Sequence, residues 1–317
     1  MQRARVSMGS ELRLSAWTAN EPAATDAFDA VFTEFDRLDG LMSVWKPGSE
    51  IVRLNDAAGD HPVAAGADLR RILQIAAQIS EWTGGKFDVT FGVLSGLWKF
   101  DHDQDNRVPD MNAVRRLMPL IDYRSIVVDD AAGTAFLEKK GMRAHLGGIG
   151  KGYAIDRGIE ILHARGFNDF MIQAGGDLYV SGLKDGRPWR LGIQDPRGPG
   201  GTSFATIDLT NATFSTSGDY ERSFVKDGRR YHHIIDPATG EPSQAGCRSV
   251  TIITGSAVMA DGLSTGVFLL GPEKGMALVQ RLPGVDAVIV TSKNEVLMTP
   301  RLNGRLTVQA PPTDAPF

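Results

Sequence analysis

The segment Phe170-Met-Ile-Gln-Ala-Gly-Gly-Asp-Leu-Tyr-Val-Ser181 holds two short strand-like runs, residues 170–173 and 178–181, on either side of a glycine turn. Further strand-like runs at 189–193 and 205–209 follow without an intervening helical pattern. Parallel strands need long crossover connections, usually helices, whereas antiparallel strands can be joined by short turns. We therefore predict an antiparallel sheet in this part of the chain, not a doubly wound parallel one.

Amphipathic helices precede this sheet segment. Apolar residues recur at helical spacing over residues 23–38 and 68–82, and Gly40 and the Gly84-Gly85 pair follow as stop signals. The other elements that we expect are strands at 11–18, 249–254, 287–291 and 295–298, a helix at 153–165, an apolar helix before the Gly271-Pro272 break and a short helix to Arg281. This mixture predicts an α+β fold of mainly antiparallel sheets with flanking helices, in one bilobal domain over residues 1–317 with its core at about 8–300.

The composition excludes several classes of protein. A net charge of −4 provides no basic stripe for nucleic acid, and no stretch approaches the ~18 apolar residues of a membrane helix. The single cysteine, Cys247, excludes an internal disulfide and a cysteine-rich metal site, and we expect a buried, inert thiol there. Glycine is in excess, with 36 residues. Such glycines indicate tight turns and close approach of the backbone to a ligand.

The first residues carry only part of an export signal. Arg3 and Arg5 supply positive charge, but the apolar run that follows in a signal peptide is missing. The chain as given is therefore expected in the cytoplasm, or in the periplasm if an export leader has been removed.

Asp261 and Thr265 are four residues apart in the stretch Ser256-Ala-Val-Met-Ala-Asp-Gly-Leu-Ser-Thr265. On a helix this spacing places both side-chain oxygens on one face, one turn apart. The surrounding residues are apolar, and a carboxylate among them is costly unless a partner compensates its charge. A hard cation such as Mg²⁺, which binds oxygen and often bridges to phosphate, would do so. The alternative is structural, with an Asp that caps a neighbouring loop and a Thr that bonds back to its own helix.

A glycine-rich segment, His145-Leu-Gly-Gly-Ile-Gly-Lys-Gly-Tyr153, leads into a predicted helix. Its backbone N–H groups and the helix N-terminus form a candidate cradle for an anion. It is not a Walker loop, which needs glycine where His145 stands, nor a Rossmann fingerprint, which needs glycine where Tyr153 stands. Lys151 either pairs with a phosphate or is a solvated lysine at the start of the helix.

Two other glycine turns carry polar residues. In residues 83–92, Phe87 and Asp88 follow a flexible turn, and the structural alternative is a hairpin entry with a capping Asp. Residues 174–177 form a tight turn between two strands, and here we favour the structural interpretation.

The pair His232 and His233 lies between a hydroxyl-rich loop at 215–220 and an Asp-Pro turn. Histidines are more often ordinary core or surface residues than catalytic ones, but this position makes the edge of an active site at least as good an interpretation. The chain has no Gly-x-Ser-x-Gly elbow and no Cys/His zinc spacing. A bound metal would therefore have oxygen ligands, which favours Mg²⁺ over zinc.

Eight segments, taken together, resemble the FAD:protein FMN transferases, the ApbE-like flavin transferase family. They are residues 42–55, 84–92 with Leu97-Trp98, 146–153, 175–177, 192–196, 216–222, 233–240 and 260–265. Each is weak alone, but they occur in the family's order over most of the chain. The resemblance implies an ApbE-like, T-fold-like α+β domain with FAD in a groove. It also implies Mg²⁺-dependent transfer of FMN from FAD to a Thr or Ser hydroxyl of an acceptor flavoprotein, with release of AMP.

The resemblance also implies which residues form the site. Asp261 and Thr265 match the metal ligands, and Gly148 matches the position that offers a backbone carbonyl to the metal. His233 matches the histidine proposed to act at the reacting hydroxyl as general base. The positions that match FAD contacts are Met8, Trp45, Lys86, Phe87 and Asp88, with Lys151 and Ile235 as looser matches.

One position departs from the family pattern. His145 stands where the family usually has an Asp that contacts the flavin nucleotide. An imidazole cannot replace a carboxylate that accepts hydrogen bonds from ribose or adenine, although it can approach a phosphate. His145 therefore keeps open the alternative of a flavin-binding protein without turnover. The other alternative is a Mg²⁺-dependent FAD pyrophosphatase that gives FMN and AMP, in which the same metal directs water and not a protein hydroxyl.

Overall fold

The computed structural model describes residues 1–315 and is built around one large sheet. Its strand order is β1-β2-β6-β7-β10-β15-β16-β17, and every neighbouring pair is antiparallel. The strands are β1 (Gln2–Ser7), β2 (Ser10–Ala16), β6 (Phe170–Ala174), β7 (Asp177–Ser181), β10 (Ala212–Gly218), β15 (Cys247–Thr254), β16 (Asp286–Thr291) and β17 (Val296–Met298). The predicted class, α+β with mainly antiparallel sheets, is confirmed.

Smaller sheets and hairpins surround the large sheet. One three-stranded sheet joins β18 (Leu306–Val308), β9 (Ser203–Leu209) and β8 (Trp189–Gln194), and another joins β3 (Val63–Ala64), β5 (Thr134–Leu137) and β4 (Ile126–Asp129). Two hairpins are formed by β11 (Ser223–Lys226) with β12 (Arg229–His232) and by β13 (Ile235–Asp236) with β14 (Glu241–Pro242).

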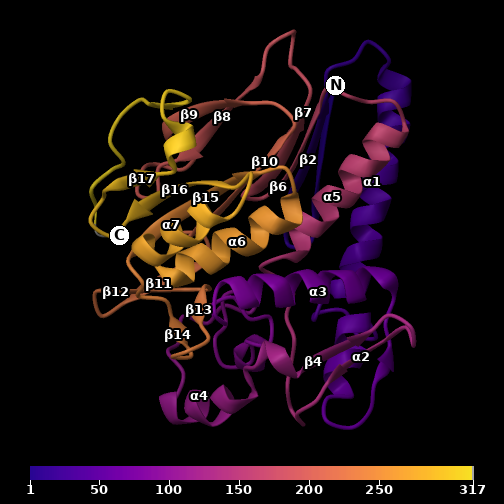
Figure 1. The fold of residues 1–317 in the computed structure, drawn as a ribbon, viewed down its shortest axis with the longest axis vertical. Coiled ribbons are helices and arrows are strands. Elements are labelled where there is room, and N and C mark those ends of the chain that lie inside the picture. Colours follow the sequence, from indigo (N-terminus) through magenta and orange to yellow (C-terminus); the bar gives the residue numbers. More distant parts are fainter. Residues whose placement is uncertain (316–317) are drawn as a thin grey trace.

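The helices cover one face of the large sheet and build a second lobe below it (Figure 1). They are α1 (Glu21–Met42), α2 (Glu50–Asp56), α3 (Ala67–Trp82), α4 (Met111–Leu117), α5 (Gly150–Ala164), α6 (Ala257–Leu270) and α7 (Pro272–Arg281). Helix α6 packs against β10 and β15, α5 packs against β6 and β7, and α5 and α6 contact each other. This arrangement places the start of α5 beside the middle of α6. No helix within residues 1–315 is long and apolar enough to span a bilayer.

Within residues 1–315, three hydrophobic clusters hold these layers together. The largest joins the helices to the sheet and includes Phe28, Phe35 and Phe170, all fully buried. A second fills the space around β8 and β9 and includes Phe204. The third lies in the lower lobe around Trp98. Burial of such side chains is the main source of stability, at about 1.5–3 kcal/mol for each large apolar group.

Several elements, among them α2, α4, β4 and β5, were not predicted, and three further differences concern the large sheet and the helix α1. Helix α1 continues through Gly40 to Met42, because Leu41 and Met42 are buried in the core and their packing outweighs the weak helix preference of one glycine. The hydroxyl-rich segment predicted as a loop at 215–220 begins inside β10, between β7 and β15. Strand β1 was not expected, and it pairs with β2 over all six of its residues.

Candidate functional site

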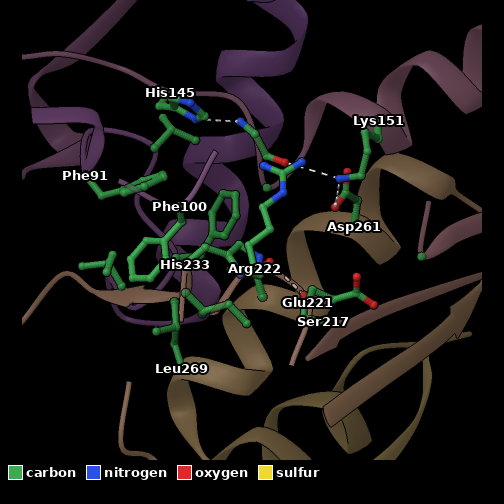
Figure 2. Close-up of a pocket in the computed structure, with 18 of the residues that line it drawn as sticks. Phe91, Phe100, His145, Lys151, Ser217, Glu221, Arg222, His233, Asp261 and Leu269 are labelled. Atoms are coloured by element: carbon green, nitrogen blue, oxygen red, sulfur yellow. Dashed lines mark hydrogen bonds and ion pairs between the residues drawn. The ribbon is translucent and has the colours of Figure 1, made fainter. Parts of the chain in front are cut away.

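A cleft of ≈ 300 Å³ (Figure 2) is lined by residues of both lobes. Its walls come from the β1–β2 turn, the segment after α3, the loop before α5, the β6–β7 turn, the end of β10, the residues around β13 and one face of α6. These segments are distant in the sequence. The sheet and helix packing described above therefore brings them to one place.

Asp261 is buried on α6, and both of its carboxylate oxygens are accounted for. Oδ2 accepts a hydrogen bond from the backbone N–H of Gly152 at 2.9 Å, and Oδ1 lies 3.7 Å from the ammonium nitrogen of Lys151. Burial, assisted by the carboxylate of Asp177, raises the pKa of Asp261 to about 7, although Lys151 opposes the shift. The buried negative charge of Asp261 is therefore costly, and a cation beside it would reduce that cost.

Lys151 lies between two carboxylates. Its Nζ is 3.1 Å from Oδ2 of Asp177 and 3.7 Å from Oδ1 of Asp261. Burial alone would lower the pKa of Lys151, but the two carboxylates outweigh it and hold the pKa above its usual range. Asp177 also accepts a hydrogen bond from Ser215 Oγ. The alternative of a solvated lysine at the start of α5 is therefore wrong.

Thr265 lies one turn after Asp261 on α6 and lines the same cleft. Its Oγ1 is 3.1 Å from Oγ of Ser217 on β10, and Ser217 Oγ is also 2.8 Å from Oγ of Ser264. Gly148 is adjacent, since a Cβ added there would lie 3.6 Å from Thr265 Oγ1. The three residues predicted as metal ligands are therefore neighbours in one wall of the cleft.

The close packing of α5 on α6 depends on two residues of α5. A Cβ at Gly152 would lie 2.3 Å from the carbonyl oxygen of Ala257, so only glycine fits. Asp156 accepts hydrogen bonds from the backbone N–H groups of Ala257 at 2.8 Å and Val258 at 3.0 Å. It therefore caps the first turn of α6 from the neighbouring helix, where unpaired N–H groups need acceptors.

The donor set fits a hard cation. Within residues 1–315 no group of three or more His, Cys, Asp or Glu side chains is placed to hold a metal ion, so a cation here would also need hydroxyl and backbone oxygens. Asp261, Thr265 and Gly148 provide one oxygen of each kind, which is the chemistry that Mg²⁺ prefers. A positive charge is already held at this point, because Lys151 lies between the two carboxylates.

His233 lines the cleft with a neutral imidazole. Its Nδ1 is buried and has no hydrogen-bond partner within the described residues. Burial, and then the positive charge of Arg222, lowers the pKa of His233 to about 3. His232 instead lies in the core, where its Nε2 is 3.1 Å from the carbonyl oxygen of Ser243. Of the predicted pair, only His233 therefore reaches the cleft.

Part of the cleft lining is aromatic and apolar. Trp98 and Phe100 stack at 5.9 Å between ring centroids with an interplanar angle of 12°, and Trp98 Nε1 donates a hydrogen bond of 2.8 Å to the carbonyl of Gly240. Phe91, Leu94 and Ile235 also belong to the apolar part of the lining, whereas Phe87 lies near Gly148 and Leu269 is on α6. A flat aromatic ligand can pack here while its charged part faces Lys151.

Most, but not all, of the residues predicted to contact FAD line the cleft. Phe87, Ile235 and His145 line the cleft, and Lys86 does so while its Nζ pairs with Asp236 at 2.6 Å. His145 Nδ1 accepts a hydrogen bond of 3.1 Å from the N–H of Gly147.

Asp88 lines the cleft but its carboxylate is already used in the capping role that the structural alternative proposed, although a short 3-10 helix, Gly92–Leu94, follows and not the proposed hairpin. It accepts hydrogen bonds from the N–H groups of Thr90 at 2.8 Å and Tyr123 at 2.9 Å. Met8 and Trp45 are not among the lining residues in the part of the chain that the structure describes. Met8 occupies the β1–β2 turn with φ of 50°, and Trp45 packs edge-on against His102 at 4.5 Å.

Three site residues were not singled out from the sequence: Asp177, Ser217 and Arg222. Asp177 belongs to the turn that we interpreted as structural, and that interpretation is right for the turn itself, because Ala174 pairs with Asp177 across the β6–β7 hairpin. The carboxylate nevertheless faces Lys151. The sequence signals for Asp177 were its place in the family-matching segment 175–177 and its position as a polar residue at the start of a mostly apolar strand.

This fold is that of the ApbE proteins of known structure. The crystal structure of the ApbE protein from Thermotoga maritima superposes with a TM-score of 0.87 at 32% identity, covering 96% of this chain and 98% of that one. The flavin transferase ApbE from Vibrio cholerae superposes with a TM-score of 0.85 at 23% identity, which supports the fold alone.

The sequence comparisons give the family directly. Residues 8–289 match the ApbE family, and the chain belongs to it. It is 32% identical to the FAD:protein FMN transferase of Treponema pallidum over 96% of this chain and 88% of that protein. It is 30% identical to an FAD:protein FMN transferase of Klebsiella pneumoniae over 93% of this chain and 90% of that protein.

Proposed function

We propose that this protein moves the FMN part of FAD to a threonine or serine hydroxyl of an acceptor flavoprotein and releases AMP, with Mg²⁺ bound. Transfer of FMN from FAD to a protein is the activity of the named relatives, which match nearly the whole chain. The observation that carries the proposal is the position of Asp261 and Thr265, one turn apart on α6 and facing the same cleft as Lys151.

Asp261, Thr265 and the backbone of Gly148 would hold the metal ion. When bound, Mg²⁺ would supply charge neutralisation at the diphosphate and at the AMP leaving group. Asp261 is held in place for this role because Gly152 donates to one of its oxygens and leaves the other directed toward the cation Lys151.

Lys151 and the start of α5 would orient the diphosphate. Two of the first N–H groups of α5 already donate, that of Gly150 to the carbonyl of Leu146 and that of Gly152 to Asp261, so the start of this helix would act on an anion mainly through the helix dipole. Lys151 is on the first turn of α5 and keeps its charge between Asp177 and Asp261. A bound diphosphate would therefore meet a positive side chain and a positive helix end.

His233 would take the proton from the incoming hydroxyl. A general base must be unprotonated at the working pH, and His233, with a pKa of about 3, is neutral throughout the physiological range. The low pKa also means that the imidazole is a weak base until a ligand changes its surroundings. We expect bound phosphate, which is negative, to raise that pKa toward the usual value of about 6.5.

The proposal is tested by measuring the transfer of FMN to an acceptor protein. A candidate acceptor protein is incubated with this protein, FAD and Mg²⁺, and its mass is measured. An added FMN mass that requires all three components supports the proposal. Rapid release of FMN and AMP from FAD alone, without labelling of an acceptor, would instead identify a pyrophosphatase. FAD retained intact for hours would identify a flavin-binding protein.

A further inference from the structure

Three permanently positive side chains line the cleft among the described residues, and each has an acidic partner. Lys86 pairs with Asp236, Lys151 pairs with Asp177 and Asp261, and Arg222 pairs with Asp101.

The partners differ in how firmly they are held. Asp236 belongs to β13 and Asp177 to β7, and their side chains are only 13% and 5% exposed. Asp101 belongs to no helix or strand, and its side chain is 27% exposed. Arg222 itself is 41% exposed. The Arg222–Asp101 pair is therefore the most solvated of the three pairs.

Solvation decides how much it costs to separate such a pair. Exposed ion pairs contribute about 0–1 kcal/mol, whereas leaving a buried charge without its partner costs several kcal/mol. Separating Lys86 or Lys151 from its carboxylate partner would therefore cost more free energy than separating Arg222 from Asp101.

Arg222 is also well placed for an anion in the cleft. It follows the end of β10, and a Cβ added at Gly9 in the β1–β2 turn would lie 3.6 Å from its Nη2. Burial and then the positive charge of Arg222 lower the pKa of His233; burial also lowers the pKa of His145, where Asp101 opposes the shift and Arg222 adds to it. Figure 2 shows its side chain extending into the space between His145 and Lys151.

We propose that Arg222 exchanges Asp101 for the diphosphate of the dinucleotide, so that Asp101 acts as an internal anion that competes with the ligand. A guanidinium binds phosphate oxygens through paired, charge-assisted hydrogen bonds, which are stronger than its pair with a solvated carboxylate. Arg222 is then a residue that selects a ligand by its phosphates. This inference rests on the proposed function, because it takes FAD as the ligand.

The two residues are predicted to act in opposite directions on ligand binding. Dissociation constants for ADP, which carries a diphosphate without the flavin, are measured by calorimetry with Mg²⁺ present. Arg222→Gln is expected to weaken ADP binding about tenfold or more, because it removes a charge-assisted contact. Asp101→Asn is expected to tighten ADP binding about two- to fivefold, because it removes an exposed competitor. In the Arg222→Gln background, Asp101→Asn should have no effect.

Adenosine separates recognition of phosphate from a structural role. Neither substitution should change adenosine binding, whereas a structural defect would weaken adenosine and ADP together. Arg190→Gln is the matched control, because Arg190 also forms an exposed pair, with Asp208 at 2.8 Å, but lies on β8 away from the cleft.

The outcomes distinguish this inference from the proposed function. Unchanged ADP binding in Arg222→Gln, or weaker ADP binding in Asp101→Asn, overturns the exchange of partners while FMN transfer stands. Failure of the unsubstituted protein to bind either ADP or FAD overturns both. If Arg222→Gln does not fold, the sign of the Asp101→Asn effect still decides the matter.

Discussion

The carboxylate of Asp261 accepts a 2.9 Å hydrogen bond from the backbone N–H of Gly152, which links the middle of α6 to the first turn of α5. The link is possible because the two helices approach more closely than any side chain at position 152 would allow. The candidate metal ligand is therefore oriented by the same contact that packs the two helices.

Replacing Gly152 by Ala is expected to destabilise the protein by about 1–3 kcal/mol, since the new methyl group would overlap the carbonyl of Ala257. Denaturant unfolding measures the change. Gly40→Ala is the matched control, because Gly40 also lies in a helix but nothing is within 4 Å of its added Cβ. That substitution should stabilise by about 0.5–1 kcal/mol through helix preference. Equal effects at the two sites would contradict this account of the helix contact.

Asp261→Asn should leave the fold intact and remove the activity. The amide oxygen of Asn can still accept from Gly152, but the charge that attracts a cation is lost. Because a bound metal contributes several kcal/mol to phosphoryl transfer, we expect a loss of roughly a thousandfold in the rate of acceptor labelling. Labelling is followed by mass spectrometry over a Mg²⁺ titration, and a chelator should inactivate the unsubstituted protein reversibly. Normal labelling by Asp261→Asn would remove the metal from the mechanism.

Asp156→Ala should destabilise α6 without touching the cleft. Its carboxylate accepts from the N–H groups of Ala257 and Val258, and losing such a cap costs about 0.5–2 kcal/mol. Asp156→Asn keeps an acceptor and should recover part of that loss. Thermal unfolding of the three proteins is the measurement. An Ala variant as stable as the parent would show that α6 does not need this cap.

The neutral state of His233 predicts a dependence of stability on pH. Its pKa is about 3 in the folded protein, mainly because of burial, and about 6.5 in an unfolded chain. Between these values the unfolded state binds more protons, so the free energy of unfolding falls as the pH is lowered from about 6.5 toward 3. His233→Asn should lose less stability than the parent over this window. His61→Asn, at a histidine that is 62% exposed, should follow the parent.

The sequence predicted those parts of the site that depend on local geometry. The spacing of Asp261 and Thr265 needs only the helical repeat to bring them to one face, and α6 supplies it. Asp177 and Arg222 could not be located in this way. Asp177 reaches Lys151 only because β7 lies beside the start of α5, and Arg222 enters the cleft only because β10 ends there.

The predicted end of α1 at Gly40 was wrong for a related reason. A single glycine is a weak local signal, and the burial of Leu41 and Met42 in the main cluster is a tertiary effect that the local pattern does not contain. The overall class was predictable because short turns between successive strands exclude parallel pairing.

The residues that line the cleft extend from Gly9 to Leu269, so segments far apart in the sequence form it. The cleft can enclose a ligand only after the last of these segments has been synthesised and has folded onto the first. Binding of a ligand therefore reports that the whole protein has folded. A ligand that binds only the assembled cleft should raise the melting temperature of both lobes together.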